Sequence, residues 1–165
     1  MNTIEGKKRE SSSKDAVKTA MKLLLYKNRT EKELTDRLLQ DDFPEEDIAE
    51  AIAYVKSFGY LNDRKYAESY AHSMGQKLSR SAIRKNLADK GVDVAEIEMA
   101  LEQIPLQEEA VVTELLKKRV GAPHILDEKE KRRVFGFLAR KGFSGNVIFR
   151  CIRSYENFAE EETAL

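Results

Sequence analysis

Residues 83–101 of the chain, IRKNLADKGVDVAEIEMAL, contain the pattern that decides the fold. Its apolar residues at the expected buried positions are Ile83, Leu87, Val92, Ile97 and Leu101. Two pairs in this set are four residues apart, which places each pair on one face of an α-helix. Gly91 lies between the pairs, and glycine tolerates the left-handed conformation that often follows a helix end. The stretch therefore predicts two short amphipathic helices joined by a sharp turn.

The same pattern occurs three times in the chain. Its earlier copy, at a constant offset of 49 residues, is Leu34, Leu38, Phe43, Ile48 and Ile52, and its later copy, at an offset of 51, is Val134, Leu138, Phe143, Ile148 and Ile152. The residue before the third apolar position is Asp42, Gly91 and Gly142 in turn. Unrelated amphipathic helices could match at some positions, but they would rarely keep a gap-free register between the first two copies. We interpret the pattern as three tandem repeats.

A third helix precedes the pair in each repeat, and we expect these first helices at about residues 16–27, 63–76 and 107–120. In the first repeat, Thr30 and Glu33 form a capping-box pattern, Pro44 suits a first helical turn, and Gly59 can end a helix. A repeat of about 50 residues cannot bury much core alone. We therefore predict an all-α fold whose three three-helix repeats stack into an elongated, curved array. The expected segments are a flexible N-terminal arm (1–13), repeats at 14–62, 63–105 and 106–157, and an acidic tail (158–165).

The composition favours long solvated helices. Charged residues make up 35% of the 165 positions and hydrophobic residues 41%, so most of the chain is not of the disordered type. Its single cysteine, Cys151, cannot form an internal disulfide, and no N-terminal apolar run resembles a signal peptide or membrane span. We therefore expect a cytoplasmic protein. Because the formal net charge is zero, attraction to nucleic acid would depend on how the charges are distributed.

Residues suited to catalysis or metal binding do not cluster in the sequence. His72 and His124 are far apart, and neither has a partner at metal-ligand spacing. Cys151 falls on an apolar helical stripe, which favours a buried hydrophobic role over a nucleophilic one. Gly6-Lys7 lacks the remaining features of a phosphate-binding loop. We expect no catalytic residues, no metal and no cofactor, and hence no enzyme.

The charges are unevenly distributed although they cancel overall. Between Lys129 and Arg153 there are eight basic residues against Glu130 alone, and the second helix of the middle repeat is more weakly basic. Ordinary solvated helix surface would also explain single charges, but Arg140 and Lys141 stand beside the sharp turn, which favours a binding face. The candidate contacts to phosphates or to an acidic protein groove are Arg80, Arg84, Lys85, Lys90, Arg132, Arg133, Arg140 and Lys141.

Three short motifs resemble a known family. They are Phe58-Gly59-Tyr60-Leu61-Asn62-Asp63-Arg64-Lys65-Tyr66-Ala67, Ser81-Ala82-Ile83-Arg84-Lys85-Asn86-Leu87 with Lys90-Gly91-Val92, and Phe137-Leu138-Ala139-Arg140-Lys141-Gly142-Phe143. In this order and spacing they resemble the RecX family, which modulates the RecA recombinase. Arg29-Thr30-Glu31-Lys32-Glu33-Leu34 also fits, and the resemblance covers residues 16–155.

The resemblance implies a crescent of three repeats that lies in the groove of the RecA filament on DNA. There it would limit filament growth and restrain the ATPase, coprotease and strand-exchange activities of RecA in repair and recombination. It implies no catalytic residues, and we expect a monomer. Some relatives are more basic, so direct DNA binding would be weak here. The alternatives are a direct DNA-binding regulator of helix-turn-helix type, which lacks the expected base-reading side chains, and a generic interaction scaffold.

Overall fold

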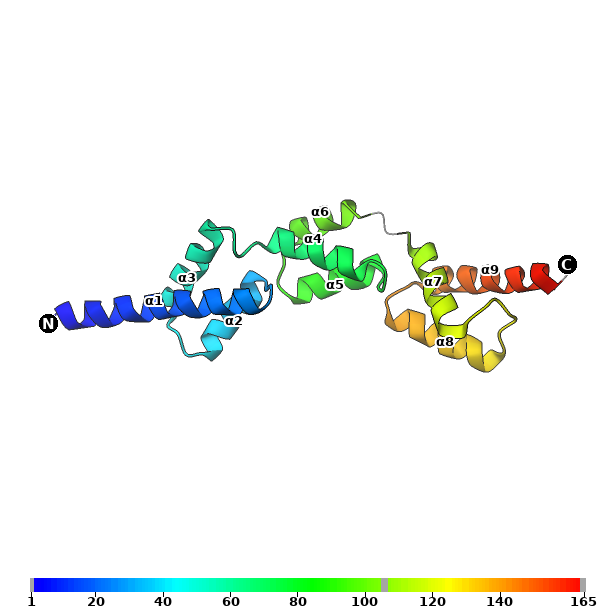
Figure 1. The fold of residues 1–165 in the computed structure, drawn as a ribbon, viewed down its shortest axis with the longest axis horizontal. Helices are drawn as coiled ribbons and strands as arrows, with labels where there is room; N and C mark the ends of the chain where they lie inside the picture. Colours follow the sequence, from blue (N-terminus) through cyan, green and yellow to red (C-terminus); the bar gives the residue numbers. More distant parts are fainter. Residues whose placement is uncertain (1, 105–106, 164–165) are drawn as a thin grey trace. The chain divides into compact units, whose positions relative to one another are not determined.

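The computed structural model describes residues 2–104 and 107–163, with side chains for residues 12–104 and 107–159. In this part of the chain the regular elements are nine α-helices and no strand (Figure 1). They are α1 (Asn2–Tyr26), α2 (Glu31–Gln40), α3 (Glu45–Ser57), α4 (Asp63–Met74), α5 (Arg80–Asp89), α6 (Val94–Glu102), α7 (Glu108–Val120), α8 (Glu128–Arg140) and α9 (Gly145–Thr163). The all-α fold with three tandem three-helix repeats is confirmed: α1–α3, α4–α6 and α7–α9.

The repeated apolar residues form the core of the helices that contain them. Every one of the fifteen predicted positions is buried except Phe43, which is half-buried against the core of the first repeat. In the first and third repeats, the buried pairs of the second and third helices belong to one hydrophobic core. The helical periodicity therefore identified the buried faces correctly.

The turn between the second and third helices has the same geometry in all three repeats. Asp42, Gly91 and Gly142 adopt positive φ angles of 61°, 80° and 87°. In each turn, the amide of the next residue donates a hydrogen bond to a carbonyl in the last turn of the preceding helix, as in Val92 to Leu87 at 3.1 Å. This bond satisfies a carbonyl that the helix end leaves open. The predicted left-handed turn is confirmed at each position.

Side-chain caps fix all three second helices at their N-termini. At α5, the Ser79 hydroxyl accepts a hydrogen bond from the Ala82 amide at 3.0 Å. Thr30 and Glu33 form the predicted capping box at α2. Asp127 and Glu130 form another at α8, which the sequence reading did not identify. Such caps satisfy amide donors that have no partner within the helix.

The two ends of the chain differ from expectation. α1 begins at Asn2, so most of the expected arm is helical, and α9 continues through residue 163 into the expected tail. Ser12 on α1 donates a hydrogen bond to the Asp47 carboxylate on α3 at 2.6 Å. Because this contact is polar, it leaves no apolar periodicity in the sequence, and the helix could not be found by that signal.

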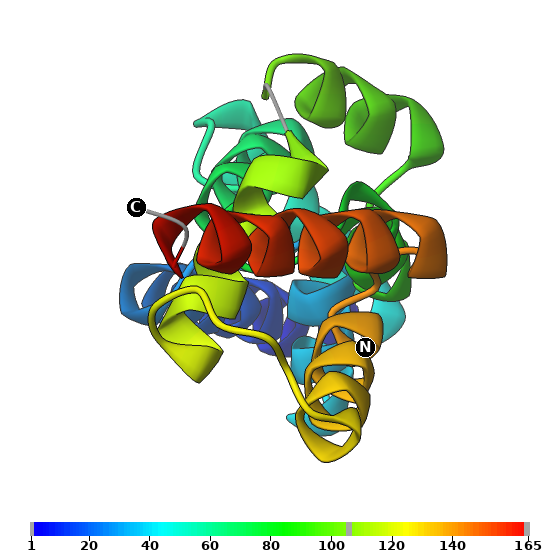
Figure 2. The same cartoon turned by 90° about the vertical axis from the view of Figure 1, so that its right-hand side faces the viewer.

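The chain divides into two compact units. One contains residues 1–69 and 87–100, and the other contains residues 70–86 and 101–165, so the residues of the middle repeat are shared between them. The first unit has a core between α1, α2 and α3, and α1 packs mainly on α3. The second has a core between α7, α8 and α9, where α9 lies across α7 (Figure 2).

Candidate functional site

The same kind of junction joins the second helix of a repeat to the following repeat twice in this chain. In the first unit, the Thr30 hydroxyl donates to the Lys90 carbonyl at 2.6 Å, and the Glu31 amide donates to the Asp63 carboxylate at 2.9 Å. Thr30 is fully buried, and this bond satisfies its hydroxyl. The contact places the turn after α5 against the N-terminus of α2.

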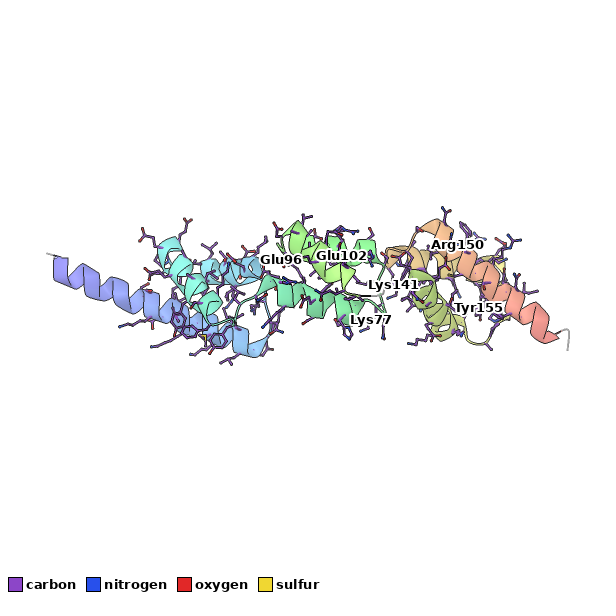
Figure 3. All side chains as sticks on the ribbon, turned by 90° about the horizontal axis from the view of Figure 1, so that it is seen from above. Lys77, Glu96, Glu102, Lys141, Arg150 and Tyr155 are labelled. Carbon is purple, nitrogen blue, oxygen red and sulfur yellow. The ribbon has the colours of Figure 1, made fainter. Side chains whose placement is uncertain are left out.

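The second unit repeats this junction at the equivalent positions. The Ser79 amide donates to the Lys141 carbonyl at 3.0 Å, and the Arg80 amide donates to the Glu108 carboxylate at 2.9 Å. Figure 3 labels Lys141, whose carbonyl makes this contact, and Lys77, which lies two residues before Ser79. Two of the candidate basic residues, Lys90 and Lys141, thus serve the junctions through their backbone carbonyls.

The side chains of these two lysines have different surroundings. The Lys90 ammonium lies 2.6 Å from the Glu33 carboxylate and 5.9 Å from the centre of the Tyr66 ring. At the position of Glu33 the second junction has Ala82, and the Lys141 ammonium instead lies 5.0 Å from the Phe137 ring centre. Lys90 is therefore held as a structural ion pair, whereas Lys141 keeps an uncompensated charge next to an aromatic ring.

The Lys90–Glu33 pair shifts the pKa of both groups. Desolvation by burial would raise the pKa of Glu33, but the hydrogen bonds from Lys90 and the Thr30 amide lower it below its ordinary value of 4.5. The hydrogen bond to Glu33 raises the pKa of Lys90 above 10.5, against the effect of desolvation. Both shifts favour the charged forms in the folded state.

We predict that Glu33→Gln lowers the free energy of unfolding at neutral pH. Because the pKa of Glu33 is lowered on folding, its stabilising effect is present above pH 4.5 and is lost as the pH falls through the folded value. The raised pKa of Lys90 preserves the effect until the pH exceeds 10.5. The stability difference between wild type and variant, measured by urea unfolding, should therefore shrink at both extremes.

The control for this measurement is Glu114→Gln. Glu114 pairs with Lys117 on an exposed face of α7 at 3.6 Å, so its replacement should change stability little. Parallel stability curves for wild type and Glu33→Gln across the acid range would contradict the structural role of the pair.

Four candidate residues gather on α8 and its C-terminal cap, and we call Arg132, Arg133, Arg140 and Lys141 the α8 basic face. The three arginines are exposed, and within the described part of the chain no carboxylate forms an ion pair with any of the four. Arg133 and Arg140 are seven residues apart and so lie on one side of the helix. By contrast, nearby Lys131 and Arg150 pair with Glu156 and Glu109.

An apolar groove of about 590 Å³ lies between α8 and α9, next to this basic face. The rings of Phe135 and Phe149 lie 5.1 Å apart in it, and Phe149 remains 64% exposed. The lining residues are Glu128, Lys131, Arg132, Phe135, Gly136, Phe149, Ile152, Arg153 and Glu156. Sequence reasoning missed this α8–α9 groove, although Phe149 falls outside the buried stripe of α9 and could have indicated it. An exposed ring beside unpaired cations suits a partner with apolar and acidic groups.

The remaining candidates are not brought into one site. Arg80, Arg84 and Lys85 lie on α5 in the second unit, where Arg84 and Lys85 make polar contacts of their own. Lys90 belongs to the first unit. The eight predicted residues therefore separate into the α8 basic face, three α5 residues and one structural lysine.

Cys151 is buried, and its desolvation raises the pKa of the thiol. This agrees with a packing role for the side chain, because the reactive form of cysteine is the thiolate. Among the described residues, no three His, Cys, Asp or Glu side chains gather as a metal site would require, and none of the helices has an apolar stretch that could span a bilayer.

Comparison with known proteins identifies the repeats. The first, second and third three-helix domains of RecX match residues 16–55, 62–101 and 107–152. The chain is 33% identical to regulatory protein RecX of Streptomyces lividans, over 87% of this chain and 78% of that protein. It is 32% identical to regulatory protein RecX of Amycolatopsis mediterranei, over 94% and 92%.

The fold also matches a solved structure. The crystal structure of RecX from Lactobacillus salivarius superposes with a TM-score of 0.69 at 29% identity, covering 89% of this chain and 98% of that one. The matching domains occur in the same order as the three repeats described above. The chain therefore belongs to the RecX family of regulatory proteins.

Proposed function

We propose that the chain binds RecA and the RecA–DNA filament, and that it mainly inhibits filament growth. By doing so it restrains ATP hydrolysis, coprotease activity and strand exchange during DNA repair and recombination. Membership of the RecX family supports this role, and no covalent step is needed for it. A protein that occupies a filament groove alters assembly by mass action alone.

The observation that carries the proposal is the α8 basic face beside the α8–α9 groove. Four cations that form no ion pair with a carboxylate in the described chain give this surface a positive potential that attracts an anionic partner. The exposed Phe149 ring supplies an apolar anchor next to them. We infer that this surface contacts an acidic, partly apolar groove of the filament.

We predict that replacing Arg132, Arg133, Arg140 and Lys141 together with Ala weakens binding to the RecA filament by at least about tenfold, or about 1.4 kcal/mol. Helix content should remain, because the arginines are exposed and surface changes usually alter stability little. Co-sedimentation with filaments and circular dichroism measure the two effects.

The control removes four positive charges elsewhere, by changing Lys18, Lys32, Lys56 and Arg64 to Ala. These side chains already pair with carboxylates of the first unit, so filament binding should change less. A salt series gives further information, since direct neutralisation of phosphates produces a steeper fall of affinity than a protein contact. Wild-type binding by the α8 variant at low and physiological salt would place the functional surface elsewhere.

The same experiments separate the alternatives. A direct DNA-binding regulator of helix-turn-helix type would bind duplex DNA equally well when RecA is absent. A generic scaffold would bind neither the duplex nor the filament. Full RecA ATPase activity in excess protein would contradict the filament proposal. The cytoplasmic location, the monomeric state and the curved, elongated arrangement stay predictions that accompany this proposed function.

A further inference from the structure

Three exposed aromatic rings lie together where α3 turns into α4. Tyr54, Phe58 and Tyr60 are 46%, 59% and 55% exposed. The ring centres of Tyr54 and Phe58 are 4.9 Å apart, and those of Phe58 and Tyr60 are 6.0 Å apart with only 20° between the ring planes. We call these three side chains the aromatic row. Large rings left in solvent side by side mark an interaction surface more often than scattered single ones do.

The backbone turn explains how the row is formed. Gly59 has a φ of +72°, and the Tyr60 amide donates to the Val55 carbonyl at 3.0 Å. This left-handed turn ends α3 and brings the side chains on either side of Gly59 together. The backbone turn at Gly59 therefore determines where the Phe58 and Tyr60 rings lie.

A polar pocket of about 250 Å³ continues from the Tyr60 end of the row. Its lining residues are Asn28, Arg29, Gly59, Tyr60, Asn62, Lys65, Tyr66 and Ser69. Two of these are cations, the others that carry polar side chains are neutral, and no carboxylate is among them. A pocket with donors and positive charge but no acid suits an anion.

Arg29 lines this pocket, and its Nε atom is buried without a hydrogen-bond partner among the described residues. Because that atom is closed to solvent, an anion in the pocket would meet the guanidinium group through its terminal nitrogens. Lys65, exposed on the first turn of α4, likewise forms no ion pair within the described chain.

We propose that the aromatic row and this pocket form a binding site for single-stranded nucleic acid. Unpaired bases stack on Tyr54, Phe58 and Tyr60, while Arg29 and Lys65 hold a backbone phosphate. Proteins that bind single strands combine these two features, a row of aromatic rings and a basic channel beside it. A protein partner fits less well, because the pocket at the end of the row is polar and lacks the aliphatic lining of an interface core. Its residues belong to the first unit, whereas those of the α8 basic face belong to the second.

The first test uses a fluorescein-labelled oligo(dT) of about 16 nucleotides, within the site sizes of single-strand binding modules. Phe58→Ala and Tyr60→Ala should each weaken its binding by about 5- to 100-fold, the range expected for loss of one stacked base. A hairpin duplex should show little change between wild type and these variants, because its bases are not free to stack. Phe158→Ala, which removes a ring of the second unit that is 58% exposed, is the control and should leave oligo(dT) binding unchanged.

The second test reports stacking directly. The chain contains no Trp, so Phe58→Trp and Phe158→Trp each introduce a single indole. Oligo(dT) should quench the indole at position 58 and not the one at position 158. Lys65→Gln should reduce the log-log salt slope by about 0.7 for the lost phosphate contact, while Lys118→Gln should leave it unchanged.

Several outcomes would overturn the proposal. One is wild-type oligo(dT) affinity in both aromatic Ala variants, and another is the absence of quenching at position 58. A third is weaker RecA-filament binding by Phe58→Ala with unchanged oligo(dT) affinity, which would make the row a protein interface. Because oligo(dT) binding is measured without RecA, failure of this site and failure of the proposed RecA role are distinguishable.

Discussion

Replacing Gly142 with Ala should lower the free energy of unfolding by about 2 to 5 kcal/mol. The left-handed conformation of this residue, with φ at +87°, costs a side chain about 1 to 2 kcal/mol. A Cβ there would also lie 2.5 Å from the Ser79 hydroxyl and 2.7 Å from the Ala82 Cβ. Ser79 is buried at the junction, so the contact can be relieved only by moving packed atoms, at a further cost of about 1 to 3 kcal/mol.

Gly59→Ala is the matched control for this prediction. Gly59 has a φ of +72° and the same turn, in which the amide of the next residue donates to the carbonyl five residues earlier, but nothing lies within 4 Å of an added Cβ. This control variant should lose only the free energy that the left-handed backbone costs a side chain, about 1 to 2 kcal/mol. Urea unfolding of both variants separates the two terms, and equal losses would show that the junction at Gly142 is not tightly packed.

Leu138→Ala should also cost about 2 to 5 kcal/mol, because it removes a fully buried side chain. Leu138 packs in the core formed by α7, α8 and α9, and it is the second apolar residue of the third repeat. Thermal and urea unfolding measure the loss. Ile125→Ala is the control, since this side chain is 64% exposed and should change stability by no more than about 0.5 kcal/mol. If Leu138→Ala lost as little stability as the Ile125→Ala control, the result would contradict a core position for Leu138.

The helices and their buried faces could be predicted because they depend on neighbours in the sequence. Leu34, Ile83 and Val134 recur at fixed offsets, and each begins a buried pair. Asp42 and Gly91 follow helix ends, where the left-handed turn favours their residue types. These signals depend only on residues that are close together in the chain, so one sequence is enough to predict the helices and turns.

The candidate surfaces could be predicted only in part. Charge counting predicted a binding role for the basic residues of α8, which stays a prediction, and it included Lys90, although Glu33 neutralises Lys90 from 57 residues away. The aromatic row was overlooked because Phe58 and Tyr60 were treated as parts of a motif and not as exposed rings. The helical start of α1 was missed because Ser12 meets α3 through a polar contact.

By itself, the sequence determined the all-α class, the three repeats, the turn positions and the family. These follow from periodicity, from residue preferences for left-handed backbone, and from motifs in a fixed order. Only the tertiary structure decided that Thr30 and Ser79 make equivalent junctions with the following repeat, and that the second junction leaves Lys141 without a carboxylate partner among the described residues. The physical reason is that an ion pair, a groove or a row of rings depends on distances between residues far apart in the chain, which helical periodicity does not specify.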